Sequence, residues 1–168
     1  MVVSKAGDWT IRNINNPPEK IWVRGIPTSG ALRVVPLFRR VVFIATGSGI
    51  GPFAPHILEK RTKYKLLWTA PNIRKTFGDK LVDTILEASP DAIVYGTSIM
   101  SLFRKSCSLA SKDTRTHGKP DMVKLTYRLV KEFDAEAVCV ISNETLTKKV
   151  VYAMMSRGIP AFGAIWDS

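Results

Sequence analysis

The most constraining feature of this chain is an alternation of apolar runs with longer stretches of helical spacing, which begins at residue 41. Short runs rich in Val, Ile and aromatic residues predict strands over 41–45, 63–70, 91–95, 135–142 and 159–166. The stretches between them predict helices over 52–60, 75–88, 120–133 and 144–158. Strands that alternate with helices form a parallel sheet through right-handed crossovers. We therefore predict an α/β fold with a five-stranded parallel sheet and helices on both faces.

The first predicted strand runs directly into a glycine-rich turn, ATGSGIGPF, at residues 45–53. In a Rossmann-like sheet of this kind, ligands bind at the carboxyl ends of the strands. Glycines let backbone N–H groups approach an anion, and the start of the following helix adds partial positive charge. The turn therefore predicts a phosphate-binding loop, in which a bulky residue at Gly49 should occupy the phosphate position. A strand–helix junction that binds no ligand is compatible with the same residues.

Neighbouring residues exclude other kinds of glycine loop. A P-loop needs Lys and then Ser or Thr after its last glycine, but Pro52 and Phe53 stand there. The usual dinucleotide and methyltransferase loops need an acidic residue at the end of the second strand. This chain has Trp68, Thr69 and Ala70 at that place, so neither pattern is complete.

The stretch ATGSGIGPF closely resembles the Thr-Gly-x-Gly-x-x-Pro turn of the ferredoxin–NADP reductase superfamily, whose members hold the pyrophosphate of NAD(P)H there. AGDWT at 6–10 resembles the Gly-x-x-Ser/Thr element that touches the flavin pyrophosphate, and VRGIPTSG at 23–30 stands where the family has a turn of its flavin barrel. The C-terminal SRGIPAFGAIWDS is similar to a fungal-type branch of membrane oxidoreductases, some of which are fused to adenylate-forming regions.

The resemblance implies that this chain binds NAD(P)H and passes hydride to FAD in a neighbouring domain. For NAD(P)H it implies contacts at the turn and at other strand ends, from Thr46, Gly47, Ser48, Gly49, Pro52, Thr69, Ser142 and Asn143. For the flavin it implies Gly7, Thr10 and Trp166, although a core or edge position would equally suit Trp166. The family's Cys-Gly-Pro is replaced by Ile141-Ser142-Asn143, so we assign no catalytic residue. Hydride transfer needs mainly the positioning of two cofactors.

We expect NADPH rather than NADH. A 2′-phosphate needs a basic, hydroxyl-bearing pocket, and the family builds one after the third strand. Thr114, Arg115 and Lys119 are the matching residues, and no carboxylate at strand two would repel the phosphate. The same residues are compatible with a solvated loop.

Residues 1–40 have a different pattern, in which PPEKIWVRGIP and ALRVVP predict short strands. We expect 1–40 to be the C-terminal remnant of an FAD-binding barrel and 41–168 to be the NAD(P)-binding domain. The flavin domain would then belong to a longer parent chain, and the isolated chain would be inactive. The Ser/Lys-rich segment 96–112 is predicted to be an insertion, although Ile99, Leu102 and Phe103 have the spacing of a genuine helix.

The net charge of +11 leaves nucleic acid, anionic lipid and anionic cofactors as possible partners. The basic residues are scattered and lack the patterns of nucleic-acid readers, so we expect no nucleic-acid partner. No apolar run reaches the roughly 18–20 residues of a membrane span, so we expect none in this chain. Cys107 and Cys139 lie far apart without histidine partners, which indicates no metal site and a reducing compartment. The resemblance implies the cytosolic face of a membrane-integral parent.

Two other functions remain open at this point. A non-catalytic nucleotide-binding or regulatory module would keep the same fold and turn. A basic protein that binds anionic surfaces would account for the charge without using the turn.

Overall fold

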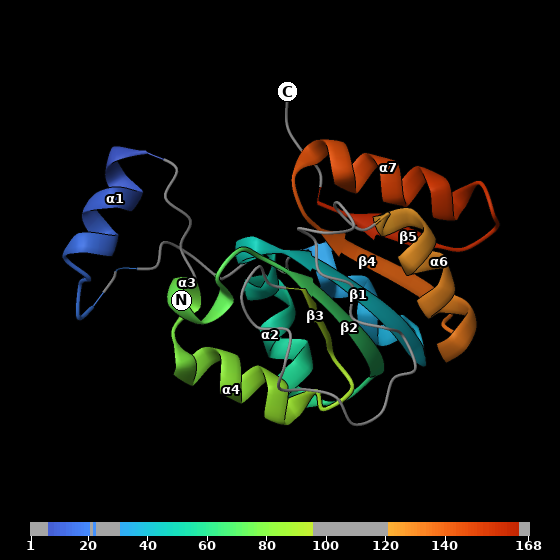
Figure 1. The fold of residues 1–168 in the computed structure, drawn as a ribbon, viewed down its shortest axis with the longest axis horizontal. Helices are drawn as coiled ribbons and strands as arrows, with labels where there is room; N and C mark the ends of the chain where they lie inside the picture. The colour runs from blue at the N-terminus through green and yellow to red at the C-terminus, as the bar shows by residue number, and fades with distance from the viewer. Residues whose placement is uncertain (1–6, 21, 23–30, 96–120, 165–168) are drawn as a thin grey trace.

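The computed structural model describes residues 7–20, 22, 31–95 and 121–164, and of these 31–95 and 121–164 form an α/β domain around one sheet (Figure 1). The strands are parallel and lie in the order β3-β2-β1-β4-β5. Their bounds are Arg40–Thr46 for β1, Lys63–Thr69 for β2, Ile93–Tyr95 for β3, Ala137–Ile141 for β4 and Ala161–Gly163 for β5. The predicted five-stranded parallel sheet is confirmed.

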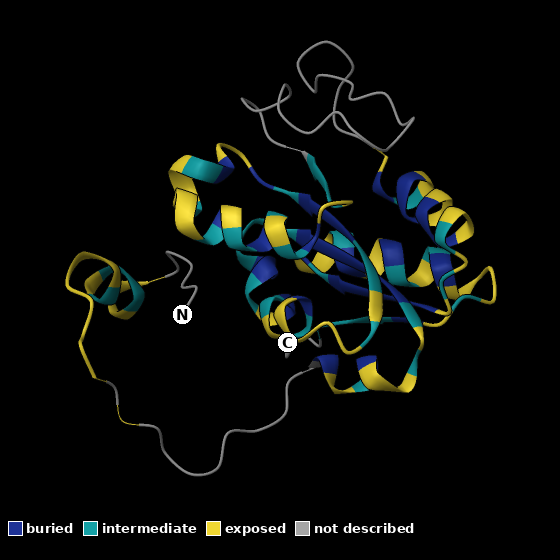
Figure 2. Cartoon of the chain, turned by 90° about the horizontal axis from the view of Figure 1, so that it is seen from below, coloured by how far each residue is buried: buried dark blue, intermediate teal, exposed yellow. Residues whose placement is uncertain are grey.

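Helices cover both faces of the sheet, as predicted (Figure 1). One face carries α2 (Ile50–Glu59), α3 (Ile73–Phe77) and α4 (Asp79–Ala88). The other carries α6 (Met122–Phe133) and α7 (Glu144–Met155). The outer sides of these helices are exposed, whereas the strands between them are largely buried (Figure 2). Buried side chains on both faces explain why β1 and β4 contain continuous apolar runs.

The central strand β1 supplies side chains to both cores. Phe43 and Ala45 point into the cluster beneath α2 and α4, whereas Val42 and Ile44 point into the cluster beneath α6 and α7. All four are fully buried. Successive strand residues face opposite sides of a sheet, so one β-branched run can fill two cores.

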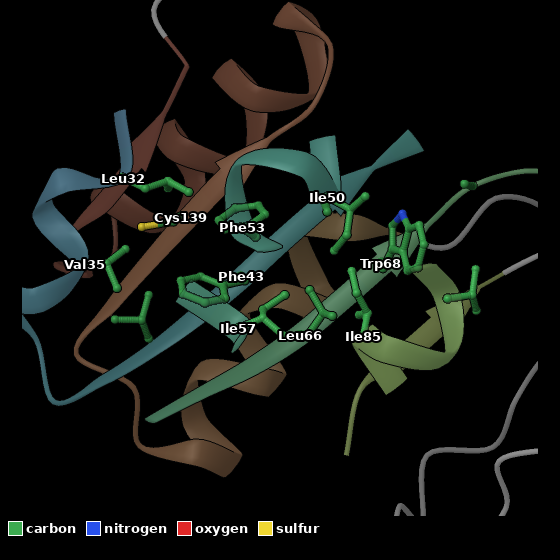
Figure 3. Packing of buried hydrophobic residues seen from close by; sticks show 14 of the residues in the cluster. Leu32, Val35, Phe43, Ile50, Phe53, Ile57, Leu66, Trp68, Ile85 and Cys139 are labelled. Carbon is green, nitrogen blue, oxygen red and sulfur yellow. The ribbon is translucent and has the colours of Figure 1, made fainter. Parts of the chain in front are cut away.

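Phe43 lies at the centre of the first core (Figure 3). Its ring stacks on that of Phe53 in α2, with ring centroids 4.7 Å apart, and on that of Tyr64 in β2, at 5.3 Å. This stack joins two neighbouring strands to the helix that follows the glycine turn.

Three local predictions are wrong in detail. The segment Ala31–Leu37, predicted as a strand, is a 3-10 helix (η1) whose Leu32 and Val35 pack into the first core. The helix predicted over 75–88 is divided into α3 and α4, because Gly78 adopts a left-handed φ of 77° between them. The prediction of a helix over 52–60 also places its two prolines in the first turn, but Pro55 lies inside α2.

The other part of the N-terminal prediction stays untested. Residues 17–20 and 22 form no helix or strand, and 23–30 lie outside the described residues. The helix α1 (Asp8–Asn15) has no buried residue and stands clear of the sheet (Figure 1). The assignment of 1–40 to a flavin barrel therefore remains a prediction.

We expect Phe43→Ala to lower the free energy of unfolding by about 3–5 kcal/mol, because it removes a fully buried ring and leaves a cavity between two strands and α2. Leu37→Ala is the control, since Leu37 is 79% exposed and its loss should cost no more than about 0.5 kcal/mol. Urea unfolding followed by circular dichroism measures both. Equal losses would contradict this account of the core.

Candidate functional site: a glycine turn at the carboxyl edge of the sheet

The glycine turn lies where β1 ends and α2 begins. Gly47–Gly49 form one 3-10 turn (η2), and α2 starts at Ile50. Gly47 has a left-handed φ of 53°, and a Cβ placed on it would meet nothing within 4 Å. The space that a side chain on Gly47 would occupy is therefore open. A helix that starts directly after such a turn is a common place for an anion to bind.

Gly49 has a different role from the one predicted. A Cβ on Gly49 would lie 2.2 Å from the carbonyl oxygen of Ile141, at the end of β4. The glycine therefore permits close packing of the turn against the neighbouring strand. The prediction that a bulky residue here would fill a phosphate position is wrong, because the missing side chain points to β4.

The ends of three adjacent strands meet beside this turn. Thr46 is paired in register with Thr69 of β2, and its Oγ1 lies 2.6 Å from the Oγ of Ser142, which follows β4. Ser142 is buried, so this hydroxyl–hydroxyl hydrogen bond ties the ends of β1 and β4 together. The structure thus brings Thr46, Thr69 and Ser142 to one edge, as their positions at strand ends predicted.

Asn143 also lies at this edge, but its side chain caps a helix. Its Oδ1 accepts a hydrogen bond of 2.9 Å from the backbone N–H of Leu146 in the first turn of α7. An N-cap asparagine satisfies one of the otherwise unpaired N–H groups of a helix. The capping role accounts for Asn143 without a ligand, while its predicted cofactor contact stays a prediction.

Beside the turn, Pro52 lines a shallow depression of about 510 Å³ that extends along α2 to α4. Its other lining residues are Ser48, Gly51, Ala54, Pro55, Leu58 and Leu81. Most of this lining is apolar, so the surface next to the turn presents little charge of its own.

Trp68 contacts the turn and was not among the predicted site residues. Its indole Nε1 donates a hydrogen bond of 3.0 Å to the carbonyl oxygen of Gly47. The indole is fully buried and packs edge to face against Phe77 at the end of α3, with ring centroids 5.2 Å apart. The sequence indicated only that Trp68 stands where other dinucleotide folds place a carboxylate.

Gly7 and Thr10 lie at the start of α1, away from the turn (Figure 1). The N–H of Gly7 donates to the hydroxyl of Thr10 at 2.9 Å, and that hydroxyl donates back to the carbonyl of Gly7 at 2.8 Å. The predicted flavin element is thus the first turn of a helix. Thr114, Arg115, Lys119 and Trp166 lie outside the described residues, as does the segment 96–112.

Cys139 is a core residue, as predicted. Burial raises the pKa of its thiol to about 12, so the thiolate is scarce at neutral pH. Within the described ranges, no group of three or more His, Cys, Asp or Glu side chains is placed to hold a metal ion. None of the helices in those ranges combines the length and apolarity that a membrane span requires.

The comparisons with known proteins agree with this geometry. A family model for the C-terminal domain of adenylate-forming reductase 03009 matches residues 31–105 and 95–168. Over all 168 residues, the chain is 65% identical to adenylate-forming reductase 03009 and 62% identical to adenylate-forming reductase 06235, both from Coprinopsis cinerea. The chain spans 15% of the length of each relative.

Two solved structures share the fold at low sequence identity. The C-terminal domain of a hydrogenase from Pyrococcus furiosus aligns with a TM-score of 0.52 at 12% identity, over 86% of this chain and 100% of that domain. The CS-b5R domains of human Ncb5or in their NAD+ form align with a TM-score of 0.51 at 11% identity, over 96% of this chain and 46% of that one. These identities show a common fold alone.

The fold and the turn together define the class of this protein, which is an α/β domain with a five-stranded parallel sheet and a glycine turn after its central strand. Within that class, the chain belongs to the family of C-terminal domains of adenylate-forming reductases.

We expect Gly49→Ala to destabilise the domain by about 3 kcal/mol or more, because its Cβ would overlap the Ile141 carbonyl and β4 cannot move away without breaking the sheet. Gly47→Ala is the matched control. Its Cβ meets open space, so only the left-handed φ costs energy, about 1 kcal/mol. The measurement is urea unfolding. A Gly49→Ala loss no larger than that of Gly47→Ala would refute the packing role.

Proposed function

We propose that this chain is the NADPH-binding half of a flavin-dependent reductase module, which passes hydride from the nicotinamide to FAD held by a neighbouring domain. The observation that carries the proposal is the open glycine turn between β1 and α2, at the carboxyl edge of a parallel sheet. Such edges are where open α/β sheets bind their ligands, and a helix N-terminus favours phosphate.

The residues of this edge fit a dinucleotide. The turn at Gly47–Gly49 would offer backbone to the pyrophosphate, and the space that a Cβ on Gly47 would occupy is open. Pro52 lies in the first turn of α2, where a missing N–H costs nothing. The hydroxyls of Thr46 and Ser142 lie between β1 and β4, where they would orient the nicotinamide end.

The chemistry of hydride transfer is supplied by the cofactors when they are bound. The chain's own contribution is to hold the dinucleotide in one orientation and to keep reactive side chains away. The Cys139 thiol suits this assignment, because it is buried and remains protonated at neutral pH. No acid or base from this domain is assigned to the reaction.

Two further elements support a flavin partner. Gly7 and Thr10 begin α1, and a Cβ on Gly7 would meet nothing within 4 Å, so this helix start is also open. Trp9 of α1 is 66% exposed, which leaves a large apolar surface for a neighbouring domain to cover. We propose that the complete flavin site forms only with that domain.

We further propose that Thr114, Arg115 and Lys119 select NADPH, and that 96–112 is an insertion before them. The two spans of the family match overlap at residues 95–105, and all but the first of these residues belong to this segment, which supports the insertion. Loops between a strand and a helix tolerate added residues without loss of the sheet.

NADPH should stabilise the chain against heat more than NADH. At a concentration of 100 times Kd, the gain is about 2.7 kcal/mol, or roughly 5–10 °C in Tm for a domain of this size.

Arg115→Ala should weaken the binding of NADPH about tenfold or more and leave the binding of NADH unchanged, because only the 2′-phosphate loses a partner. Arg61→Ala makes the same charge change at the amino end of β2 and should have no effect.

Thermal scans with each nucleotide measure these shifts. No stabilisation of the wild-type chain by either nucleotide would contradict the proposed function. A stabilisation that falls equally with Arg61→Ala and Arg115→Ala would show binding by net charge alone.

Hydride transfer is tested separately. With added FAD and ferricyanide, the 168-residue chain should oxidise NADPH no faster than free FAD does, because it holds too little of a flavin site. Full-length adenylate-forming reductase 03009, loaded with FAD, should oxidise NADPH well above that background. A full-length relative that binds NADPH without oxidising it would favour the non-catalytic module instead.

A further inference from the structure

The buried indole of Trp68 touches the glycine turn at one atom. Its Nε1 donates a hydrogen bond of 3.0 Å to the Gly47 carbonyl oxygen, and the side chain has no exposed surface. Figure 3 shows Trp68 among the buried residues of the first core. Phe77 packs edge to face on the indole, at an interplanar angle of 61°. Trp68 is therefore held by α3 on one side and holds the turn on the other.

The hydrogen bond from Trp68 also affects the N–H group that follows the Gly47 carbonyl. In a planar trans peptide, the C=O and the next N–H point in opposite directions. An indole that holds the Gly47 carbonyl towards β2 therefore fixes the plane of the peptide between Gly47 and Ser48. Gly47 has a left-handed φ of 53° and no Cβ, so its own conformational preference does little to hold that plane.

The indole cannot replace the carboxylate that other dinucleotide folds have at this place. An indole N–H is a donor only, whereas a carboxylate accepts from ribose hydroxyls. Trp68 is also fully buried, so it cannot touch a ligand at the surface of the turn. Its effect on any ligand must pass through the backbone of the turn.

We propose that Trp68 is a positioning residue for the dinucleotide pyrophosphate, because its indole N–H holds the Gly47–Ser48 peptide in the orientation that the anion meets. This inference rests on the proposed function. A preorganised backbone raises affinity because the ligand need not order it on binding.

The test compares Trp68→Phe with Tyr64→Phe in the 168-residue chain. Trp68→Phe removes the indole N–H and keeps a buried ring. Tyr64→Phe removes a hydroxyl at the other end of the same strand, where it donates to the Ala88 carbonyl at 3.0 Å and contacts the Ser89 hydroxyl at 2.7 Å. Both variants lose a partly buried hydrogen bond from β2, but only one of these bonds reaches the turn.

Titration calorimetry measures Kd for NADPH and for adenosine 2′-monophosphate, which lacks the pyrophosphate. We expect Trp68→Phe to raise the Kd of NADPH about three- to tenfold, the range of one hydrogen bond, and to leave that of the mononucleotide unchanged. Tyr64→Phe should leave both Kd values unchanged, even where it lowers Tm as much as Trp68→Phe does.

Equal NADPH affinity in wild type and Trp68→Phe would overturn the inference and leave the proposed function intact. Weaker binding of both nucleotides by Trp68→Phe would also overturn it, since that result indicates general damage. No NADPH binding by the wild-type chain would overturn both proposals.

A second measurement does not depend on the folding of that variant. The indole N–H resonance of Trp68 is assigned by elimination with Trp9→Phe, Trp22→Phe and Trp166→Phe. NADPH should shift this resonance and slow its hydrogen exchange, whereas adenosine 2′-monophosphate should do neither. A resonance that is indifferent to NADPH would overturn the inference.

Discussion

The close approach of the glycine turn to β4 is the constraint on which this domain depends. Gly49 lies against the Ile141 carbonyl at a distance that no other residue type permits. At the same junction, α2 starts at Ile50, and the hydroxyls of Thr46 and Ser142 lie 2.6 Å apart where β1 and β4 end. The arrangement of residues at the carboxyl ends of β1 and β4 thus includes a close backbone contact.

A site made mainly of backbone has a particular electrostatic character. Partial charges on N–H groups at a helix start favour an anion without a buried formal charge, which would be costly to desolvate. The buried side chains nearest the turn, Trp68 and Ser142, are both neutral. Under the proposed function, the net charge of +11 would act over a longer range, by raising the local concentration of an anionic cofactor rather than by orienting it.

The sheet could be predicted from the sequence because each strand obeys a strong local rule. The residues Val41 to Ala45 are apolar without interruption, and a strand buried on both faces requires that pattern. The glycine turn was equally visible, because strand, glycines and helix follow one another directly. The sequence could not show what a side chain on Gly49 would meet. That depends on β4, which comes almost a hundred residues later in the chain.

The errors have two different local causes, and the first is that helical periodicity does not show where a helix breaks. The residues 75–88 keep helical spacing across Gly78, and the left-handed turn there became visible only in the fold. The segment 31–37 carries a β-branched pair, Val34 and Val35, that favours a strand on propensity. It forms a 3-10 helix because the first core accepts Leu32 and Val35 from one side of the segment, three residues apart.

The contact of Trp68 with the turn is also a feature that the sequence showed only in part. Its aromatic character was visible in the sequence, but its importance depends on one polar atom and on the single carbonyl that this atom reaches. A core side chain that also orients a functional backbone is constrained twice, by volume through Phe77 and by hydrogen bonding through Gly47. Substitutions that satisfy the first constraint and fail the second would leave a stable domain with a poorly oriented turn. If the turn binds the proposed cofactor, stability and cofactor affinity should therefore be separable at this position, although the residue lies in the core.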